Sequence, residues 1–465
     1  MREIIQNSRI EKALKQAENY SVDQVREIIK KALLRKGLSL EEVAVLLSVK
    51  EPGLAVEIKS AAKKLKESIY GNRIVIFAPL YITNECINDC LYCGFRRSNT
   101  ELERKTLTLE QLKKETELLL KMGQKRILLV CGEHPKYANA DFISEAVKAV
   151  YEVKDEKGSS IRRINVNVAP LEVEDFKKIK ETGIGTYQMF QETYHEETYK
   201  KMHPTGPKSD YNKRLTAFEK AFEAGIDDLG AGVLFGLYDY KYETLALISH
   251  CEYLEEKIGV GPHTISIPRI EPALNAPAAN TVPYPIEDEE FMKLVAIIRL
   301  AVPYTGIILS TRETPEMRAK LLHLGVSQVS AGSKTDPGGY EDDLKDKHDH
   351  SQQFAVGDFR TLDEVIRELA QNGFIPSFCT SCYRLGRTGI DFMAITKPGL
   401  IQQFCQPNAL VTFKEYLLDY ASEETRKVGE NLIKYELEKI SNEQAREKTR
   451  EMLRKIEDGK RDLYC

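Results

Sequence analysis

Three cysteines in one short loop have a spacing suited to iron–sulfur chemistry. Cys86, Cys90 and Cys93 form a CX3CX2C pattern, and three thiolates at this spacing can hold three corners of a cubane cluster. The fourth iron is then left without a protein ligand, so it can bind and activate another molecule. Zinc would need a fourth Cys or His close by, and the next histidine, His134, lies far downstream. The loop therefore predicts a [4Fe-4S] cluster with one open iron.

A second set of three cysteines lies nearer the C-terminus. Cys379 and Cys382 form a CX2C pair, and Cys405 follows after twenty-two intervening residues. Alone, a CX2C pair is consistent with a redox pair or with half of a zinc site. No nearby His pair completes a zinc ribbon, and no βαβ unit carries the pair at its first helix. We expect a second iron–sulfur cluster here, again one ligand short. No role is predicted for the remaining cysteines, which are Cys131, Cys251 and Cys465.

The hydrophobic pattern predicts the elements that must position these cysteines. From about residue 73 to 372 short apolar strands alternate with amphipathic helices, several of which end at a glycine just before the next strand. The strands are expected near residues 74–78, 127–131, 163–168, 185–190, 228–234, 263–268, 306–310 and 327–331. Eight such units indicate a closed (β/α)8 TIM-type barrel, an α/β fold. No Gly-rich phosphate fingerprint follows the first strand, which argues against a Rossmann sheet.

We expect three regions along the chain. Residues 1–70 form an N-terminal helical segment, because capping boxes at Ser21/Gln24 and Ser39/Glu42 precede apolar periodicity. Residues 71–372 form the barrel, and residues 373–465 form a mainly helical C-terminal extension that carries the second cysteine set.

Polar residues follow several of the predicted strands, at the end of a barrel where enzymes place their chemistry. The first cysteine set follows strand one, and the other candidates at this end are Gly132, Glu133, Asn167, Gln191, Glu192, Ser310 and Arg312. Arg312 stands in a Ser-Thr-Arg-Glu sequence, which offers a guanidinium and two hydroxyls suited to an amino-acid carboxylate. The alternative is a structural salt bridge between Arg312 and Glu313 or Glu192.

The second cysteine set is expected at the opposite end of the barrel. Barrel helices return to the bottom, and the helix capped at Thr361 ends near Gly373, so Cys379 emerges there. His263 starts strand six, which is also at the bottom. A lone histidine is more often a packing residue than a ligand, but its place near three cysteines makes a metal role credible.

Composition narrows the range of partners and compartments. The formal net charge of −4 is well mixed, so no basic surface for nucleic acid is indicated. The apolar runs are too short to span a bilayer, and no signal-peptide pattern opens the chain. Nine cysteines in such a chain indicate cytoplasmic thiols and metal ligands, not disulfides.

The first cysteine loop, with the aromatic Tyr92 just before its last cysteine, resembles that of the radical S-adenosylmethionine (SAM) enzymes. The resemblance implies that Gly132 and Glu133 hold the methionyl amino group of SAM, although Cys131 replaces the first glycine of the family's Gly-Gly-Glu element. Arg214 would pair with the methionyl carboxylate, unless it is an exposed helix arginine. Tyr92 and Asn167 complete the expected SAM contacts.

Both cysteine sets together resemble those of the radical-SAM tyrosine lyases of [FeFe]-hydrogenase maturation, over residues 70 to 410. The resemblance implies that L-tyrosine is cleaved at its Cα–Cβ bond to p-cresol and dehydroglycine, after a 5′-deoxyadenosyl radical removes a hydrogen from its amino group. The matching arginine, Arg312, would grip the substrate carboxylate, near Ser310, Gln191 and Glu192. At the second cluster, dehydroglycine would yield carbon monoxide and cyanide. That cluster carries an additional iron in the family, with His263 as its ligand.

The same resemblance implies partners and leaves two rival functions. A low-potential electron donor of the ferredoxin or flavodoxin type would supply electrons, and hydrogenase maturation proteins would receive an iron unit with CO and cyanide. The nearer rival is the tyrosine lyase of thiamine biosynthesis, a 2-iminoacetate synthase whose family lacks the second cysteine set. The distant rival is a non-catalytic iron–sulfur carrier, which would have closed four-cysteine clusters and no need for Arg312 and Glu133 at a barrel mouth.

Overall fold

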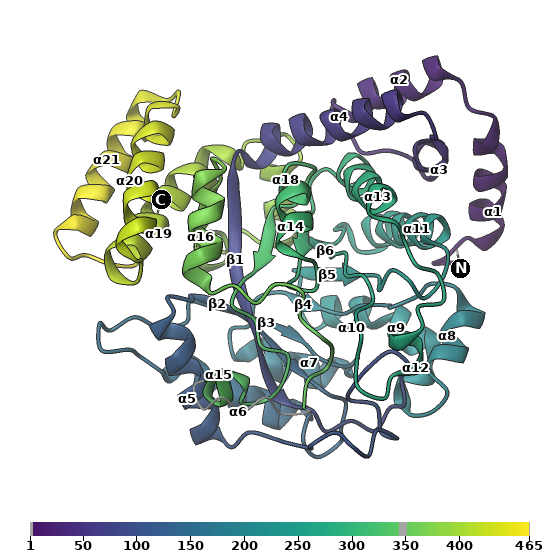
Figure 1. Cartoon of the computed structure of the whole chain (residues 1–465), viewed down its shortest axis with the longest axis horizontal. Coiled ribbons are helices and arrows are strands. Elements are labelled where there is room, and N and C mark those ends of the chain that lie inside the picture. The colour runs from purple at the N-terminus through teal and green to yellow at the C-terminus, as the bar shows by residue number, and fades with distance from the viewer. Residues whose placement is uncertain (1–2, 344–350, 465) are drawn as a thin grey trace.

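Parallel strands close into a barrel, as the alternating pattern predicts (Figure 1). The computed structural model describes residues 3–343 and 351–464, so Cys465 lies outside the described residues. The described strands are β1 (Arg73–Thr83), β2 (Arg126–Cys131), β3 (Arg163–Asn167), β4 (Tyr187–Gln188), β5 (Leu229–Gly232), β6 (Thr264–Ser266), β7 (Gly306–Leu309), β8 (Gln328–Ser330) and β9 (Ile375–Ser377). Strands β1 to β8 pair in chain order, and β1 pairs with both β2 and β8, which closes the barrel.

The ninth strand, β9, was not predicted. It runs parallel to the first residues of β1, with Arg73 opposite Ile375 and Val75 opposite Ser377. The strand has only three residues and contains Pro376, a residue that is confined to sheet edges because it cannot donate a backbone hydrogen bond. Its position fixes the chain that follows, including Cys379, at the bottom of the barrel.

The local signals at helix ends are confirmed. Capping boxes form at Ser21, Ser39 and Thr361, where the sequence predicts helix starts, and another forms at Thr108, each with its partner three residues later. Glycines that were expected to end helices adopt positive φ at Gly123, Gly183, Gly225 and Gly325.

The helices in the first half of the chain include an N-terminal group that lies outside the barrel (purple in Figure 1). They are α1 (Asn7–Gln16), α2 (Val22–Ala32), α3 (Leu40–Ser48), α4 (Pro52–Tyr70), α5 (Leu109–Lys121), α6 (Ala140–Glu152), α7 (Val173–Glu181), α8 (Glu196–Met202), α9 (Tyr211–Leu215), α10 (Ala217–Glu223) and α11 (Tyr240–Ile258), with 3-10 helices at Ala17–Asn19 and Pro207–Ser209. Helix α4 packs on α13 and α3 packs on α11, so the N-terminal helices cover the outside of the barrel's helical ring.

The remaining helices are α12 (Pro277–Asn280), α13 (Asp288–Ala301), α14 (Pro315–Leu322), α15 (Gly339–Asp343), α16 (Leu362–Gln371), α17 (Ser381–Arg384), α18 (Gly389–Thr396), α19 (Gln402–Asp419), α20 (Glu423–Glu438) and α21 (Glu443–Glu457). Helix α19 packs against β9, α20 and α21, and α20 packs against α16 (yellow and green in Figure 1). The C-terminal helices are thereby attached to the N-terminal end of β1. Among the described helices, none combines the length and the hydropathy that a membrane span requires.

Candidate functional site

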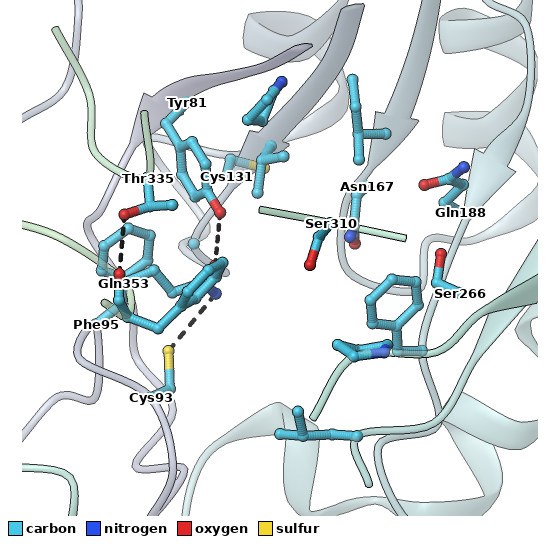
Figure 2. A pocket seen from close by; sticks show the side chains of 18 of the residues that line it. Tyr81, Cys93, Phe95, Cys131, Asn167, Gln188, Ser266, Ser310, Thr335 and Gln353 are labelled. Carbon is cyan, nitrogen blue, oxygen red and sulfur yellow. Dashed lines mark hydrogen bonds between the residues drawn. The ribbon is translucent and has the colours of Figure 1, made fainter. Parts of the chain in front are cut away.

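A large cavity opens at the C-terminal ends of the strands, and we call it the first pocket. It has a volume of about 1400 Å³ including its open mouth. It brings together most of the residues predicted for the first site, namely Cys86, Tyr92, Cys90, Cys93, Gly132, Glu133, Asn167, Glu192, Arg214, Ser310 and Arg312. Figure 2 shows Cys93 on one side of this pocket and the polar side chains of Asn167, Gln188, Ser266 and Ser310 across from it.

Two of the three thiols of the first pocket, those of Cys90 and Cys93, are held in a dry environment. Cys90 is 5% exposed, and its burial raises the pKa of its thiol to about 12. Burial also raises the pKa of Cys93. Thiols in such surroundings stay protonated unless a metal centre replaces the proton. The donor set therefore fits a metal cluster better than a free reactive cysteine.

The predicted Gly-Glu pair lies directly against the cysteine loop. A Cβ at Gly132 would be 2.3 Å from the carbonyl oxygen of Glu85, so only glycine allows the loop to approach the end of β2 this closely. Asn88 donates a hydrogen bond to Glu133 Oε2 at 2.7 Å, and its amide nitrogen is 3.7 Å from Cys86 Sγ. Asn88 therefore joins the cysteine loop to the carboxylate that is expected to hold SAM.

Glu192 is at the centre of a buried charged group. Its backbone has a φ of +69°, a region that non-glycine residues rarely adopt and that costs energy. Its carboxylate is 2.7 Å from Lys208 Nζ and 3.7 Å from Arg214 Nη2. Burial acts to raise the pKa of Glu192, but the two cations outweigh it and the pKa is lowered. Arg214 is 7% exposed, so the alternative of an exposed helix arginine is wrong.

Tyr92 is fixed from behind by a histidine. Its hydroxyl is 2.8 Å from His203 Nε2, and the Nδ1 of the same ring is 2.8 Å from the carbonyl oxygen of Tyr199. Burial places the pKa of His203 well below its usual value, so the ring is neutral. Tyr92 therefore presents a rigid aromatic wall beside the cysteines.

Arg312 has a free guanidinium that faces the first pocket. The two carboxylates proposed as its salt-bridge partners are engaged elsewhere, since Glu313 pairs with Arg269 and Glu192 pairs with Lys208. The Arg312 side chain stacks on Phe354 instead, with Cζ 3.2 Å from the ring centroid. A half-buried guanidinium without a carboxylate partner among the described residues suits an incoming carboxylate.

Gln191 is the one candidate of the first site that does not line the pocket. It is 1% exposed, and neither atom of its amide finds a hydrogen-bond partner among the described side chains and backbone. Its predicted role near the substrate therefore stays a prediction.

A second pocket lies at the opposite end of the barrel and has a volume of about 550 Å³. Its lining includes Cys379, Cys382, Cys405 and His263. Cys379 follows β9, and Cys405 lies on α19, which also supports the cysteine loop because Asn408 donates to Ser381 Oγ at 3.1 Å. Burial raises the pKa of Cys382 to about 12.

The cysteines of the two pockets lie beyond opposite ends of β1, while the pocket linings meet within the strand, where Val75 lines the second pocket and Phe77 lines the first. This strand has eleven residues, and at a rise of about 3.3 Å per residue and the usual barrel tilt, its ends are roughly 25 Å apart along the barrel axis. The two cysteine sets therefore form separate sites.

His263 is a neutral imidazole in the wall of the second pocket. Its burial lowers its pKa to about 4, and its Nε2 is 3.1 Å from the hydroxyl of Tyr383. Its Nδ1 is 3.5 Å from Asp228 Oδ1 and has no hydrogen bond among the described residues. Histidine binds metals as a neutral imidazole, and the Asp228 carboxylate lies near the Nδ1 of this ring.

Arginines surround the second pocket. Arg73, Arg126 and Arg163 are the first residues of β1, β2 and β3, and each is at most 9% exposed. Burial raises the pKa of Cys405, and the positive charge of Arg73 opposes this rise. Arg126 donates to the carbonyl oxygen of Cys379 at 2.7 Å, while its Nε and that of Arg73 lack partners among the described groups. This end of the barrel therefore favours anionic groups.

Both cysteine sets fit iron–sulfur clusters by the chemistry of their donors. Within the described part of the chain no three Cys, His, Asp or Glu side chains are close enough to hold a single metal ion. That finding does not bear on a cubane, whose separate irons hold their thiolates farther apart than one ion does.

Sequence reasoning missed several residues that shape these pockets. Lys208, Asn88 and Gln353 line the first pocket, and Arg73 and Arg126 line the second. The arginines carried a signal, because each directly precedes the apolar residues of a predicted strand. Gln353 lies in a loop without a motif, and nothing local indicated its place.

Two family models match the barrel. The model described as Radical SAM superfamily matches residues 80–250, and the model described as Biotin and Thiamin Synthesis associated domain matches residues 266–375. The first spans the cysteine loop, the Gly-Glu pair and Arg214. These matches assign the barrel to the radical SAM class, whose members use SAM and a [4Fe-4S] cluster.

Solved structures and a curated relative narrow the assignment within the radical SAM class. The crystal structure of HydG, described as a maturase of the [FeFe]-hydrogenase, is 51% identical, with a TM-score of 0.96 and full coverage of both chains. HydG from Carboxydothermus hydrogenoformans is 40% identical, with a TM-score of 0.83 and coverage of 96% of this chain and 97% of that one. The 2-iminoacetate synthase of Escherichia coli strain K12 is 32% identical over 75% of this chain and 89% of its own length. The chain belongs to the HydG family of radical SAM enzymes.

Proposed function

We propose that this protein cleaves L-tyrosine at the Cα–Cβ bond to p-cresol and dehydroglycine in the first pocket, and converts dehydroglycine to carbon monoxide and cyanide in the second. The product would be an iron unit with CO and cyanide for [FeFe]-hydrogenase assembly. The observation that carries the proposal is the pair of separate three-thiol pockets at opposite ends of one barrel, the second of which also contains His263.

In the first pocket the chain's own residues would hold the reactants. The cluster and SAM, when bound, would supply a 5′-deoxyadenosyl radical. Cys86, Cys90 and Cys93 would hold the cluster, while Gly132, Glu133 and Arg214 would bind the methionyl group. Asn167 and Tyr92 would contact the remainder of SAM.

Arg312 would bind the tyrosine carboxylate through its free guanidinium, with Ser310 beside it. The backbone amide of Arg312 is 3.4 Å from Ser310 Oγ, so the hydroxyl and the guanidinium belong to one short turn after β7.

In the second pocket Cys379, Cys382 and Cys405 would hold a [4Fe-4S] cluster, and His263 would bind an additional iron. The arginines at the starts of β1 and β2 would stabilise the negative charges of dehydroglycine and cyanide at this end of the barrel. A ferredoxin or flavodoxin type protein would donate electrons, and other hydrogenase maturation proteins would receive the iron unit.

The three regions predicted from the sequence fit this division of labour. Residues 71–372 would contain the first site, and residues 373–465 would supply the thiols of the second. Residues 1–70 would stabilise the helical ring from outside.

The test is release of carbon monoxide, trapped by a haem protein, from anaerobically reconstituted protein given SAM, a reductant and tyrosine. We expect CO together with p-cresol. p-Cresol without CO would overturn the second half of the proposal and favour a lyase that stops at dehydroglycine, the reaction of the 2-iminoacetate synthases.

A further inference from the structure

A loop that follows β8 lies over the first pocket and contacts both the cysteine loop and Arg312. The residues concerned are Gln353 and Phe354, which are adjacent in sequence and both line the pocket. Gln353 contacts the cysteine loop, and Phe354 contacts Arg312 (Figure 2 shows the Gln353 contacts).

Gln353 reaches the sulfur of a predicted cluster ligand. Its Nε2 is 3.7 Å from Cys93 Sγ, within range of an N–H···S hydrogen bond. Its Oε1 accepts a hydrogen bond from the Tyr81 hydroxyl at 2.7 Å. The opposite orientation of the amide would direct its oxygen at a thiolate, which is repulsive, so the observed orientation is the stable one.

Tyr81 makes this orientation rigid. It is 5% exposed and packs edge-to-face on Phe95 with ring centroids 5.9 Å apart. Burial raises the pKa of Tyr81, so its hydroxyl keeps its proton and acts as a donor. Tyr81, Gln353 and Cys93 therefore form a fixed chain of hydrogen bonds, visible in Figure 2.

The backbone of the loop is tied to the cysteine loop as well. Gly94, the residue after Cys93, donates its N–H to the Gln353 carbonyl oxygen at 2.9 Å. A Cβ at Gly94 would lie 2.5 Å from the carbonyl oxygen of Gln352. Gln353 donates its own N–H to the Thr335 carbonyl oxygen at 2.9 Å. The close contact thus depends on glycine at position 94, and it holds the amide at a set distance from the sulfur.

We propose that Gln353 is a positioning residue that sets the reduction potential of the first cluster through its hydrogen bond to Cys93, while its neighbour Phe354 positions Arg312 for the substrate. An N–H donor at a ligand sulfur stabilises the reduced cluster, which carries one more negative charge, more than the oxidised cluster. Gln353 therefore raises the potential of the first cluster. The proposal rests on the cluster and the substrate assigned to this pocket above.

The test compares two neighbouring substitutions in the full-length, reconstituted protein. Potentiometric titration monitored by electron paramagnetic resonance follows the signal that SAM alters, which identifies the first cluster. Gln353→Leu should shift its midpoint potential to more negative values and leave the second cluster unchanged. Phe354→Leu should leave both potentials unchanged and raise the KM for tyrosine severalfold. An unchanged first potential in Gln353→Leu with full iron content, or an equal shift in Phe354→Leu, would overturn the proposal.

A second variant covers the case in which Gln353→Leu does not hold its cluster. Tyr81→Phe keeps the ring packing but removes the hydroxyl that donates to the Gln353 oxygen. The midpoint potential of the first cluster should then become more negative, by a smaller amount than in Gln353→Leu. No shift would overturn the proposal. Failure of the proposed function is separate, because it would appear as absence of the SAM-responsive signal or of p-cresol in the unmodified protein.

Discussion

Each pocket is lined by three cysteines, but the groups that act on the sulfur atoms differ in charge between the two pockets. In the first pocket they are neutral amides, since Asn88 is close to Cys86 and Gln353 is close to Cys93. In the second pocket the backbone N–H of Ser381 donates to Cys379 Sγ at 3.4 Å, and the positive charge of Arg73 acts on Cys405.

This difference suits two different tasks. A cluster that reduces SAM must keep a low potential, and a neutral donor stabilises its reduced form less than a cation does. A centre that gathers cyanide becomes more anionic, and buried arginines offset that charge. The comparison predicts that damage to the second pocket leaves the first able to act.

The largest effect is expected from Cys90→Ala. Without this thiol the first cluster loses one of three ligands, so formation of 5′-deoxyadenosine and p-cresol should fall to background. Both products are measured by liquid chromatography after anaerobic reconstitution. Cys251→Ala is the control, because Cys251 is buried in α11 and lines neither pocket. Normal yields from Cys90→Ala would remove the SAM assignment.

Cys382→Ala should separate the two half reactions. The second cluster lies roughly a strand length away, so p-cresol should still form while CO release falls to background. CO release is measured by haem-protein trapping, and p-cresol is measured by liquid chromatography on the same sample. Loss of p-cresol in a protein that retains its first cluster would contradict the separation of the two sites.

Arg312→Lys should weaken tyrosine binding in the first pocket and leave the second untouched. A lysine ammonium cannot make the paired hydrogen bonds of a guanidinium, and the loss of about 2 kcal/mol corresponds to a roughly thirtyfold rise in KM. Steady-state p-cresol formation at varied tyrosine measures it. Arg269→Lys is the control, because Arg269 pairs with Glu313 and does not line the pocket. An unchanged KM in Arg312→Lys would assign the carboxylate to another group.

Much of this architecture could be predicted because its signals are local. Capping boxes, helix-ending glycines and cysteine spacing each depend on residues within a few positions of one another, and the structure confirms the caps and glycines. The strand β9 was not predicted because its three residues, which include Pro376, give no periodicity. Its partner strand also lies some 300 positions earlier in the chain.

Partners that depend on tertiary packing were harder to predict. The salt-bridge alternative for Arg312 looked reasonable because Glu313 is adjacent, yet Glu313 turns toward Arg269 in another loop. Gln353 and Cys93 are separated by 260 positions, and only the fold brings them together.

His263→Ala should reduce the additional iron in the second pocket. Among the described residues that line this pocket, His263 is the one histidine. If it binds the proposed additional iron, labile iron in excess of the two clusters should fall after reconstitution. Iron content before and after mild chelation measures it. Tyr383→Phe is the matched control, since it removes the hydroxyl near His263 Nε2 but keeps the imidazole. Equal labile iron in His263→Ala would return the residue to a packing role.

The smallest effect, and the sharpest test of the charge difference, is expected from Arg73→Gln. This change keeps a hydrogen-bond donor near Cys405 but removes its charge, so the potential of the second cluster should become more negative while that of the first stays constant. Arg73→Lys, which retains the charge without the planar fork, should shift it less. Potentiometric titration of both variants measures the two clusters separately. If a neutral glutamine left the second potential unchanged, the arginines would serve the fold alone, and the charge of Arg73 near Cys405 would carry no functional meaning.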